Sequence, residues 1–167
     1  MVKTETPPPP PLITENAVAF VDVKTGLVSY KYRNIVSSDE TAAVYNWILE
    51  GLDWFDEDKF RGAIFDFRDV KKFALGNMVL AKETSQELND SSNFSIFPIS
   101  MVVANTVQEV KVRMSMMGGD IYRKHISQSP EGALDFINQW NEAHDRQFDN
   151  LKDVLQMWPT LEKTVAE

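Results

Sequence analysis

Two carboxylates and an arginine, Asp66, Arg68 and Asp69, are the side chains in this sequence best suited to chemistry. Two carboxylates at this spacing could share a proton or hold a metal ion, and an arginine could grip an anion. They come just past a predicted strand over residues 61–66, and the carboxyl ends of strands in open α/β sheets form the ligand crevice. The alternative is a structural role in a turn, in which Asp66 accepts hydrogen bonds from backbone amides and Arg68 and Asp69 are solvated. The sequence leaves both interpretations open.

The two histidines lack the motifs that usually accompany catalytic ones. His125 lies on a predicted strand beside two basic residues, and His144 lies on the last predicted helix. No Gly-x-Ser-x-Gly turn occurs, and the glycine pair at 118–119 follows a helix instead of opening one. We therefore expect no catalytic residue. An enzyme that uses Asp66, Asp69 and His125 stays as a hypothesis, which requires their side chains to converge on one pocket.

Further candidate binding residues flank the ends of the neighbouring predicted elements. Asn77 is a candidate helix cap, and Asn105 and Gln108 follow the fourth predicted strand. The stretch RMSMMGG carries Met114 and Met117, and methionine adapts to varied apolar shapes. These methionines either line a groove for a lipid-like ligand or a partner helix, or pack in the core. We expect these five residues and the acidic pair to share one rim for a ligand or partner.

Composition excludes several classes of function. Seventeen basic and 25 acidic residues give a net charge of −8, which argues against binding to nucleic acid or to anionic lipid. The absence of cysteine excludes disulfides, cysteine-ligated metals and thiol catalysis. With only two histidines, we expect no metal and no cofactor. The absence of cysteine fits a cytoplasmic location. No apolar run approaches the length of about eighteen residues that a spanning helix needs, and the start does not read as a secretory signal.

The alternation of apolar segments and helical patterns predicts an α/β fold. Residues 17–23 and 27–33 read as a hairpin around Gly26. The remaining predicted elements, in chain order, are a helix over 39–54, a strand over 61–66, a helix from 77, a strand over 99–104, a helix from 106, a strand over 121–126 and a helix over 129–148. The order ββαβαβαβα implies about five strands and four helices, in a mixed and mostly parallel sheet.

Segments at both ends are expected to lie outside this domain, which we place at residues 15–148. Residues 1–14 predict a disordered leader, and its five prolines at 7–11 favour a polyproline II conformation. A ligand for an aromatic groove is the alternative role for that run. Residues 149–167 predict an amphipathic tail helix that packs on its own domain or across a subunit interface. That tail, with tyrosines expected to be exposed on the hairpin, predicts a homodimer.

This order of elements resembles that of STAS-type domains, named for sulfate transporters and anti-sigma-factor antagonists, over residues 15–145. The local matches are AIFDFRDVKKF at 63–73 and SPEGALDFI at 129–137, and the chain is most similar to stand-alone bacterial STAS-like proteins. The resemblance implies a non-catalytic module. The family's antagonists carry a phosphorylatable serine or threonine at the start of the helix after the third strand. Residues 73–77 hold no hydroxyl here, and Thr84 and Ser85 lie inside the helix, so no phosphorylation site is carried over.

The sequence thus predicts a cytoplasmic, non-catalytic binding or regulatory module of STAS-like type. We expect it to engage a protein partner or a small ligand at the strand-end rim near residues 66–77. The alternatives are a carrier of an apolar or lipid-like ligand, or an enzyme that uses the acidic pair.

Overall fold

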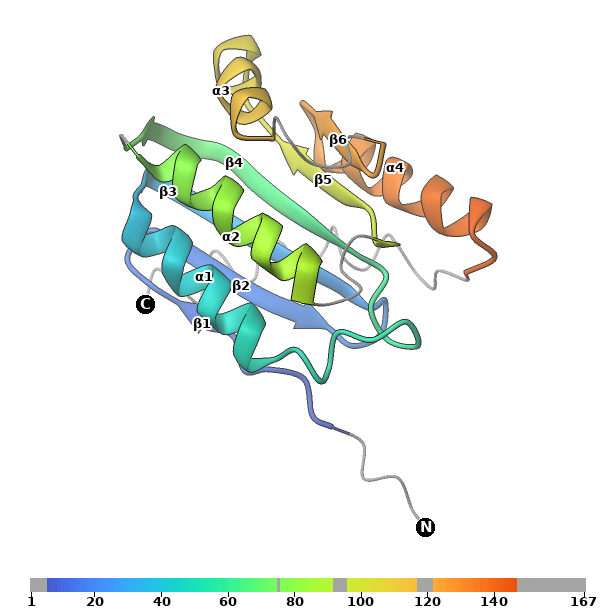
Figure 1. Ribbon diagram of the computed structural model, residues 1–167. Coiled ribbons are helices and arrows are strands. Elements are labelled where there is room, and N and C mark those ends of the chain that lie inside the picture. The colour runs from blue at the N-terminus through green and yellow to red at the C-terminus, as the bar shows by residue number, and fades with distance from the viewer. Residues whose placement is uncertain (1–5, 75, 92–95, 117–121, 147–167) are drawn as a thin grey trace.

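A six-stranded sheet with helices on both faces forms the body of the protein (Figure 1). The computed structural model describes residues 6–74, 76–91, 96–116 and 122–146. The strands are β1 (Leu12–Ile13), β2 (Ala17–Asp22), β3 (Leu27–Val36), β4 (Gly62–Phe73), β5 (Ile99–Val102) and β6 (Lys124–Ser127). The helices are α1 (Ser38–Glu50), α2 (Asn77–Ser91), α3 (Thr106–Met116) and α4 (Pro130–Ala143). The tail predicted at 149–167 and Met117 lie outside the described residues.

The strands lie in chain order across the sheet. β1, β2 and β3 pair antiparallel, whereas β3, β4, β5 and β6 pair parallel. This confirms the predicted mixed α/β sheet with an opening hairpin and four helices. The sixth strand is β1, which begins at Leu12, inside the segment expected to be a leader. In the described part of the chain, no helix combines the length and the apolar character that crossing a bilayer requires.

Helices α1 and α4 begin at polar caps. Ser37 accepts a hydrogen bond from the backbone N–H of Glu40 at 3.3 Å. Ser129 accepts a hydrogen bond from the backbone N–H of Gly132 at 3.1 Å, and a proline follows it in the first turn of α4. Such caps satisfy amides that the first helical turn leaves without partners. Both caps therefore fix where a helix leaves the carboxyl edge of the sheet.

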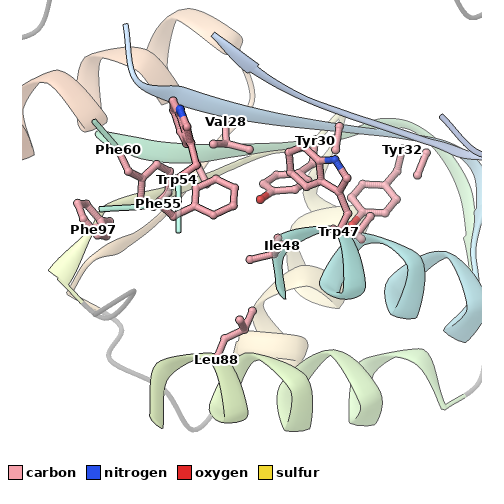
Figure 2. Packing of buried hydrophobic residues seen from close by; sticks show 14 of the residues in the cluster. Val28, Tyr30, Tyr32, Trp47, Ile48, Trp54, Phe55, Phe60, Leu88 and Phe97 are labelled. Atoms are coloured by element: carbon pink, nitrogen blue, oxygen red, sulfur yellow. The ribbon is translucent and has the colours of Figure 1, made fainter. Parts of the chain in front are cut away.

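The core has two parts, one on each face of the sheet. α1, α2 and α3 cover a face rich in aromatic side chains, whereas α4 packs its apolar side on the other face. Tyr30 stacks on Phe65 with centroids 4.3 Å apart, and Tyr32 stacks on Phe67 at 5.1 Å. Figure 2 shows how the tyrosines meet Trp47 of α1. Tyr30 and Tyr32 are 1% and 4% exposed, so the expectation that they lie on the surface was wrong.

β4 continues well beyond the point where the sequence predicted a turn. Its pairing with β3 extends to Val36 and Phe73, and two register shifts absorb the irregular spacing. The expected turn at Arg68 and Asp69 was therefore wrong. Polar residues are tolerated there because a parallel partner strand satisfies the backbone, leaving only the side chains to find partners. Phe67 and Phe73 thus become part of the sheet surface.

The turn between β2 and β3 packs closely against the loop that precedes β4. Gly26 has φ +74°, and a Cβ built there would lie 2.1 Å from the carbonyl oxygen of Lys59. Gly76 has a similar φ of +82° but nothing within 4 Å of such a Cβ. We predict that Gly76→Ala costs about 1 kcal/mol through backbone strain alone. Gly26→Ala should cost at least about 2 kcal/mol more, because the clash adds to the same strain. Urea unfolding measures both, and equal losses would contradict the close approach.

Candidate functional site

Asp66 lies in the middle of β4, not past its end, and its side chain is fully buried. Its carboxylate accepts hydrogen bonds from the Arg68 backbone N–H at 3.0 Å, from Nε at 3.0 Å and from Nη2 at 2.8 Å. The two side chains share a face because they are two positions apart in a strand. This bidentate grip is among the stronger charge-assisted contacts. The Arg68 guanidinium therefore binds a carboxylate of its own strand, which competes with binding of an external anion.

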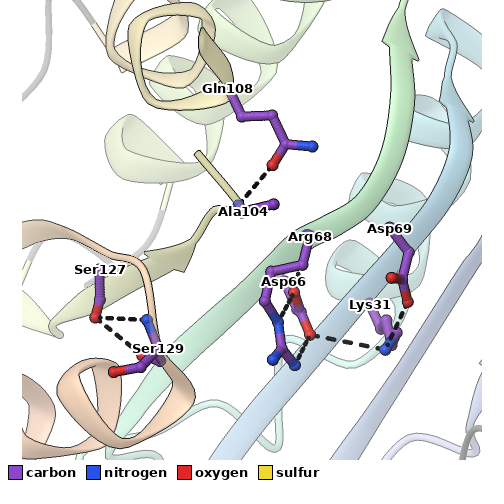
Figure 3. A network of polar contacts seen from close by, with 8 residues as sticks. All are labelled: Lys31, Asp66, Arg68, Asp69, Ala104, Gln108, Ser127 and Ser129. Atoms are coloured by element: carbon purple, nitrogen blue, oxygen red, sulfur yellow. Dashed lines mark hydrogen bonds and ion pairs between the residues drawn. The ribbon is translucent and has the colours of Figure 1, made fainter. Parts of the chain in front are cut away.

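Lys31 joins the two aspartates from the neighbouring strand (Figure 3). Its Nζ lies 3.0 Å from Asp69 Oδ2 and 3.8 Å from Asp66 Oδ2. Asp66 pairs in register with Lys31, but Asp69 pairs with Arg33, so β4 holds one more residue than β3 between these pairs. That bulge turns Asp69 to the Lys31 side of the sheet. The structure thus brings the acidic pair together as part of a network with two cations, which holds both charges in place.

His125 stands apart from this network. It lies on β6, two strands away from β4, where its ring stacks on Phe136 of α4 at 4.7 Å. Its Nδ1 is 3.4 Å from Ser100 Oγ of β5. Two strand spacings already amount to about 10 Å, so Asp66, Asp69 and His125 do not converge on one pocket. The enzyme hypothesis required that convergence, and the geometry gives it no support.

The predicted rim residues on the helices act mainly as ties between elements. Asn105 accepts a hydrogen bond from the Gln108 backbone N–H at 3.0 Å and so caps α3. The Gln108 side chain accepts from the Ala104 N–H and donates to the Val70 carbonyl, both at 2.8 Å. Asn77 accepts from the Thr41 hydroxyl and joins α2 to α1. The described structure does not include the side chain of Met114.

An apolar pocket opens at this same end of the molecule, between the sheet and the helices α1, α2 and α3. It has a volume of about 110 Å³. Its sheet side is aromatic, with Tyr32 from β3 and Phe65, Phe67 and Phe73 from β4. An apolar cavity of about 150 Å³ admits benzene, so this smaller pocket suits a short alkyl chain. It lies at the predicted rim, because Phe67, Phe73 and Asn77 belong to residues 66–77.

The charged side chains that line the pocket favour a ligand of negative charge. Lys111 and Lys124 line it, and among the described residues no aspartate or glutamate does. Lys111 Nζ also lies 6.0 Å from the centre of the Phe73 ring. Burial raises the pKa of Tyr32 and of Tyr45, so both phenols stay neutral at physiological pH. In a chain of net charge −8, this pocket favours a ligand with an anionic or hydrogen-bond-accepting end.

Sequence reasoning missed the aromatic lining and both lysines. The signal was present in the strands, since Tyr30 and Tyr32 alternate along β3 as Phe65 and Phe67 do along β4. Parallel pairing in register places two such rows side by side. The lysines come from α3 and β6, and only the tertiary fold brings them to the pocket.

The charged network on β4 generates a prediction about stability. Asp66→Asn should cost about 2–3 kcal/mol, because a neutral amide leaves Arg68 without its carboxylate and turns an N–H₂ group toward donors. Asp69→Asn is the matched control, since Asp69 is 60% exposed and its pair with Lys31 should be worth less than about 1 kcal/mol. Denaturant unfolding measures both, and a larger loss for Asp69→Asn would contradict this assignment.

His125 generates a prediction about pH. Partial burial, and then the positive charge of Arg113, lower the pKa of His125 below the ordinary value of 6.5. The unfolded chain therefore binds this proton more readily than the folded one, and the histidine's contribution to stability falls as pH drops from 6.5 through the folded pKa. A titration of the imidazole by NMR should give a midpoint below 6.5. His125→Gln should flatten stability against pH in this range, and a midpoint above 6.5 would overturn the assignment.

No family model matches the chain, and no curated protein matches its sequence. Solved structures with a similar fold include the following two. One is an uncharacterised protein of the DUF3478 family with a SpoIIAA-like fold from Shewanella loihica PV-4, at 11% identity and TM-score 0.52, covering 73% of this chain and 94% of that one. The other is an anti-sigma factor antagonist from Mycobacterium paratuberculosis, at 10% identity and TM-score 0.51, covering 76% of this chain and 99% of that one.

These similarities confirm the STAS-type resemblance at the level of the fold. Both solved structures are matched over nearly their whole length, so the likeness is to a complete domain. Identities of 10% and 11% carry no residue roles from one protein to the other. What this chain shares with the anti-sigma factor antagonist, and with the DUF3478 protein, is the SpoIIAA-like fold.

Proposed function

We propose that this protein is a non-catalytic binding module, with its recognition site at the strand-end rim around residues 66–77. The pocket carries the proposal, because it is an apolar hollow that reaches the carboxyl edge of the sheet at Val36 and Phe73, the last residues of β3 and β4. Ligands of open α/β sheets bind at that edge. The acidic pair, the other candidate for chemistry, is held by Arg68 and Lys31 and faces the opposite side of the sheet from the pocket.

The ligand that suits this pocket is small and mostly apolar, with one anionic or accepting end. Aromatic rings of β3 and β4 would contact its apolar part by stacking and dispersion. Lys111 and Lys124 would attract its polar end. This deepens the apolar-ligand alternative from the sequence, and the described residues that support it include Phe67, Phe73 and Met101.

A protein partner is a second candidate function, and exposed valines favour it. Val79 of α2 is 61% exposed, and Val107 and Val110 of α3 are 66% and 53% exposed. All three lie in the first two turns of helices that start at the carboxyl edge. Similarity of fold to an anti-sigma factor antagonist agrees with a regulatory partner. A second copy of this chain is one such partner, and sedimentation that detects only monomer at tens of micromolar would remove that homodimer.

Binding of matched small molecules tests the ligand proposal. Hexanoate should bind in the millimolar range, because Lys111 and Lys124 attract its carboxylate. Hexanol, which is neutral, should bind more weakly, and hexylamine, which the lysines repel, should bind least. Ala81 lines the pocket from α2, so Ala81→Leu should fill it and weaken hexanoate binding by about tenfold or more. The control is Val79→Leu, an exposed change on the same helix. The Met101 methyl resonance reports the binding directly.

Two results would contradict the ligand proposal. One is that none of the three compounds shifts the Met101 methyl resonance. The other is that hexanoate binds the Ala81→Leu variant as tightly as it binds the wild type. The valine surface lies outside the pocket, so recognition of a protein should survive Ala81→Leu and fail on Val107→Asp. That pattern would favour the second candidate over the first.

A further inference from the structure

The proline run packs against the domain at the edge opposite to the rim. The carbonyl oxygen of Pro10 accepts a hydrogen bond from Trp47 Nε1 at 2.6 Å. Pro9 is partly buried, and a Cβ built on Gly51 would lie 2.9 Å from its Cγ. In Figure 1 this segment passes the C-terminal end of α1. The leader is therefore in contact with one indole and one glycine of the same helix end.

The surface under the prolines has the features that polyproline recognition uses. Trp54 follows α1, and its ring packs edge-to-face on Phe55 with centroids 5.5 Å apart. Aromatic side chains therefore lie beside Gly51. A hollow of about 430 Å³ lies between residues 6–8 of the leader and Trp54, Lys59 and Arg61. Domains that bind proline-rich segments do so in aromatic-lined grooves. Gly51 lets the proline ring approach the backbone closely, since any larger residue would occupy its place.

A run of five prolines is suited to such a groove. Each proline holds φ near −65°, so the segment loses little conformational entropy when it docks. A polyproline II helix makes no internal hydrogen bonds, which leaves its carbonyl oxygens free to accept from a donor such as an indole N–H. At about 3.1 Å per residue, five prolines span about 16 Å, enough to cross the end of α1.

We propose that Trp47, Gly51 and Trp54 form a polyproline-binding groove, which the leader of the same chain occupies and from which a proline-rich segment of another protein displaces it. A covalent tether gives the leader an effective concentration in the millimolar range. Weak intrinsic binding through one hydrogen bond and one ring contact therefore suffices to keep the groove filled. A proline-rich partner has to compete with that concentration, which makes the leader an intramolecular inhibitor of its own groove.

The test compares two full-length chains, the wild type and a variant in which residues 7–11 are changed to serine. A synthetic peptide with the sequence of residues 4–12 is added to each, and the indole N–H resonance of Trp47 is followed by NMR. The variant should bind the peptide at least about tenfold more tightly than the wild type, because its groove is open. Adding Trp47→Phe to the variant removes one hydrogen bond and should weaken peptide binding, followed in this variant by the Gly51 amide resonance, by about 2- to 12-fold. Trp140→Phe, on α4, is the control and should leave it unchanged.

Two results would overturn the proposal. One is no shift of the Trp47 indole signal in the serine variant at millimolar peptide, with a folded amide spectrum. The other is equal affinity of the variant and the wild type.

Gly51→Ala tests the same point without altering the leader, in case the serine variant does not fold. Gly51 has φ −98°, which alanine adopts without strain, and the added methyl would press on Pro9. This variant should release the leader and so shift the Trp47 indole signal, at nearly unchanged thermal stability, and the same methyl should also keep the added peptide from binding tightly. An unchanged indole signal, or peptide binding as tight as that of the serine variant, would contradict a groove at this position.

Discussion

The parallel pairing of β3 with β4 is the constraint on which the rest of the structure depends. It runs from Leu27 and Gly62 to Val36 and Phe73, so it is the longest ladder in the described sheet. In-register pairing sets Tyr30 against Phe65, and Tyr32 stacks on Phe67 at the first register shift, with ring centroids 4.3 and 5.1 Å apart. Aromatic stacking adds to the burial of these large side chains. A slip by one residue would turn both rows to the other face, so the register is strongly specified.

Both proposed sites are built on this ladder. Toward the carboxyl edge, Tyr32, Phe65, Phe67 and Phe73 form the aromatic sheet wall of the rim pocket. Toward α1, Trp47 packs edge-on against Tyr30 with centroids 5.9 Å apart, which holds its indole N–H in place for Pro10. On the opposite face, the same register brings Lys31 to Asp66. The charged residues that first suggested chemistry thus help to fix the strand pair, and the apolar side chains offer the space for a ligand.

Local patterns predicted the fold well, because each element carries its own signal. Helix caps at Ser129 and near Ser37, the turn glycine Gly26 and the apolar strands are all properties of short segments. The end of β4 was predicted wrongly, since Arg68 and Asp69 have turn chemistry and only the partner strand keeps them extended. The pocket lining could not be predicted for a similar reason. Lys111 and Lys124 belong to different elements, and no local pattern shows that they meet.

A crystal structure of the protein grown with hexanoate tests the central claim most directly. The account predicts an alkyl chain against Phe67 and Phe73, with the carboxylate within hydrogen-bond or ion-pair reach of Lys111 or Lys124. A pocket closed by its own aromatic side chains, with hexanoate absent or bound elsewhere on the surface, would contradict it.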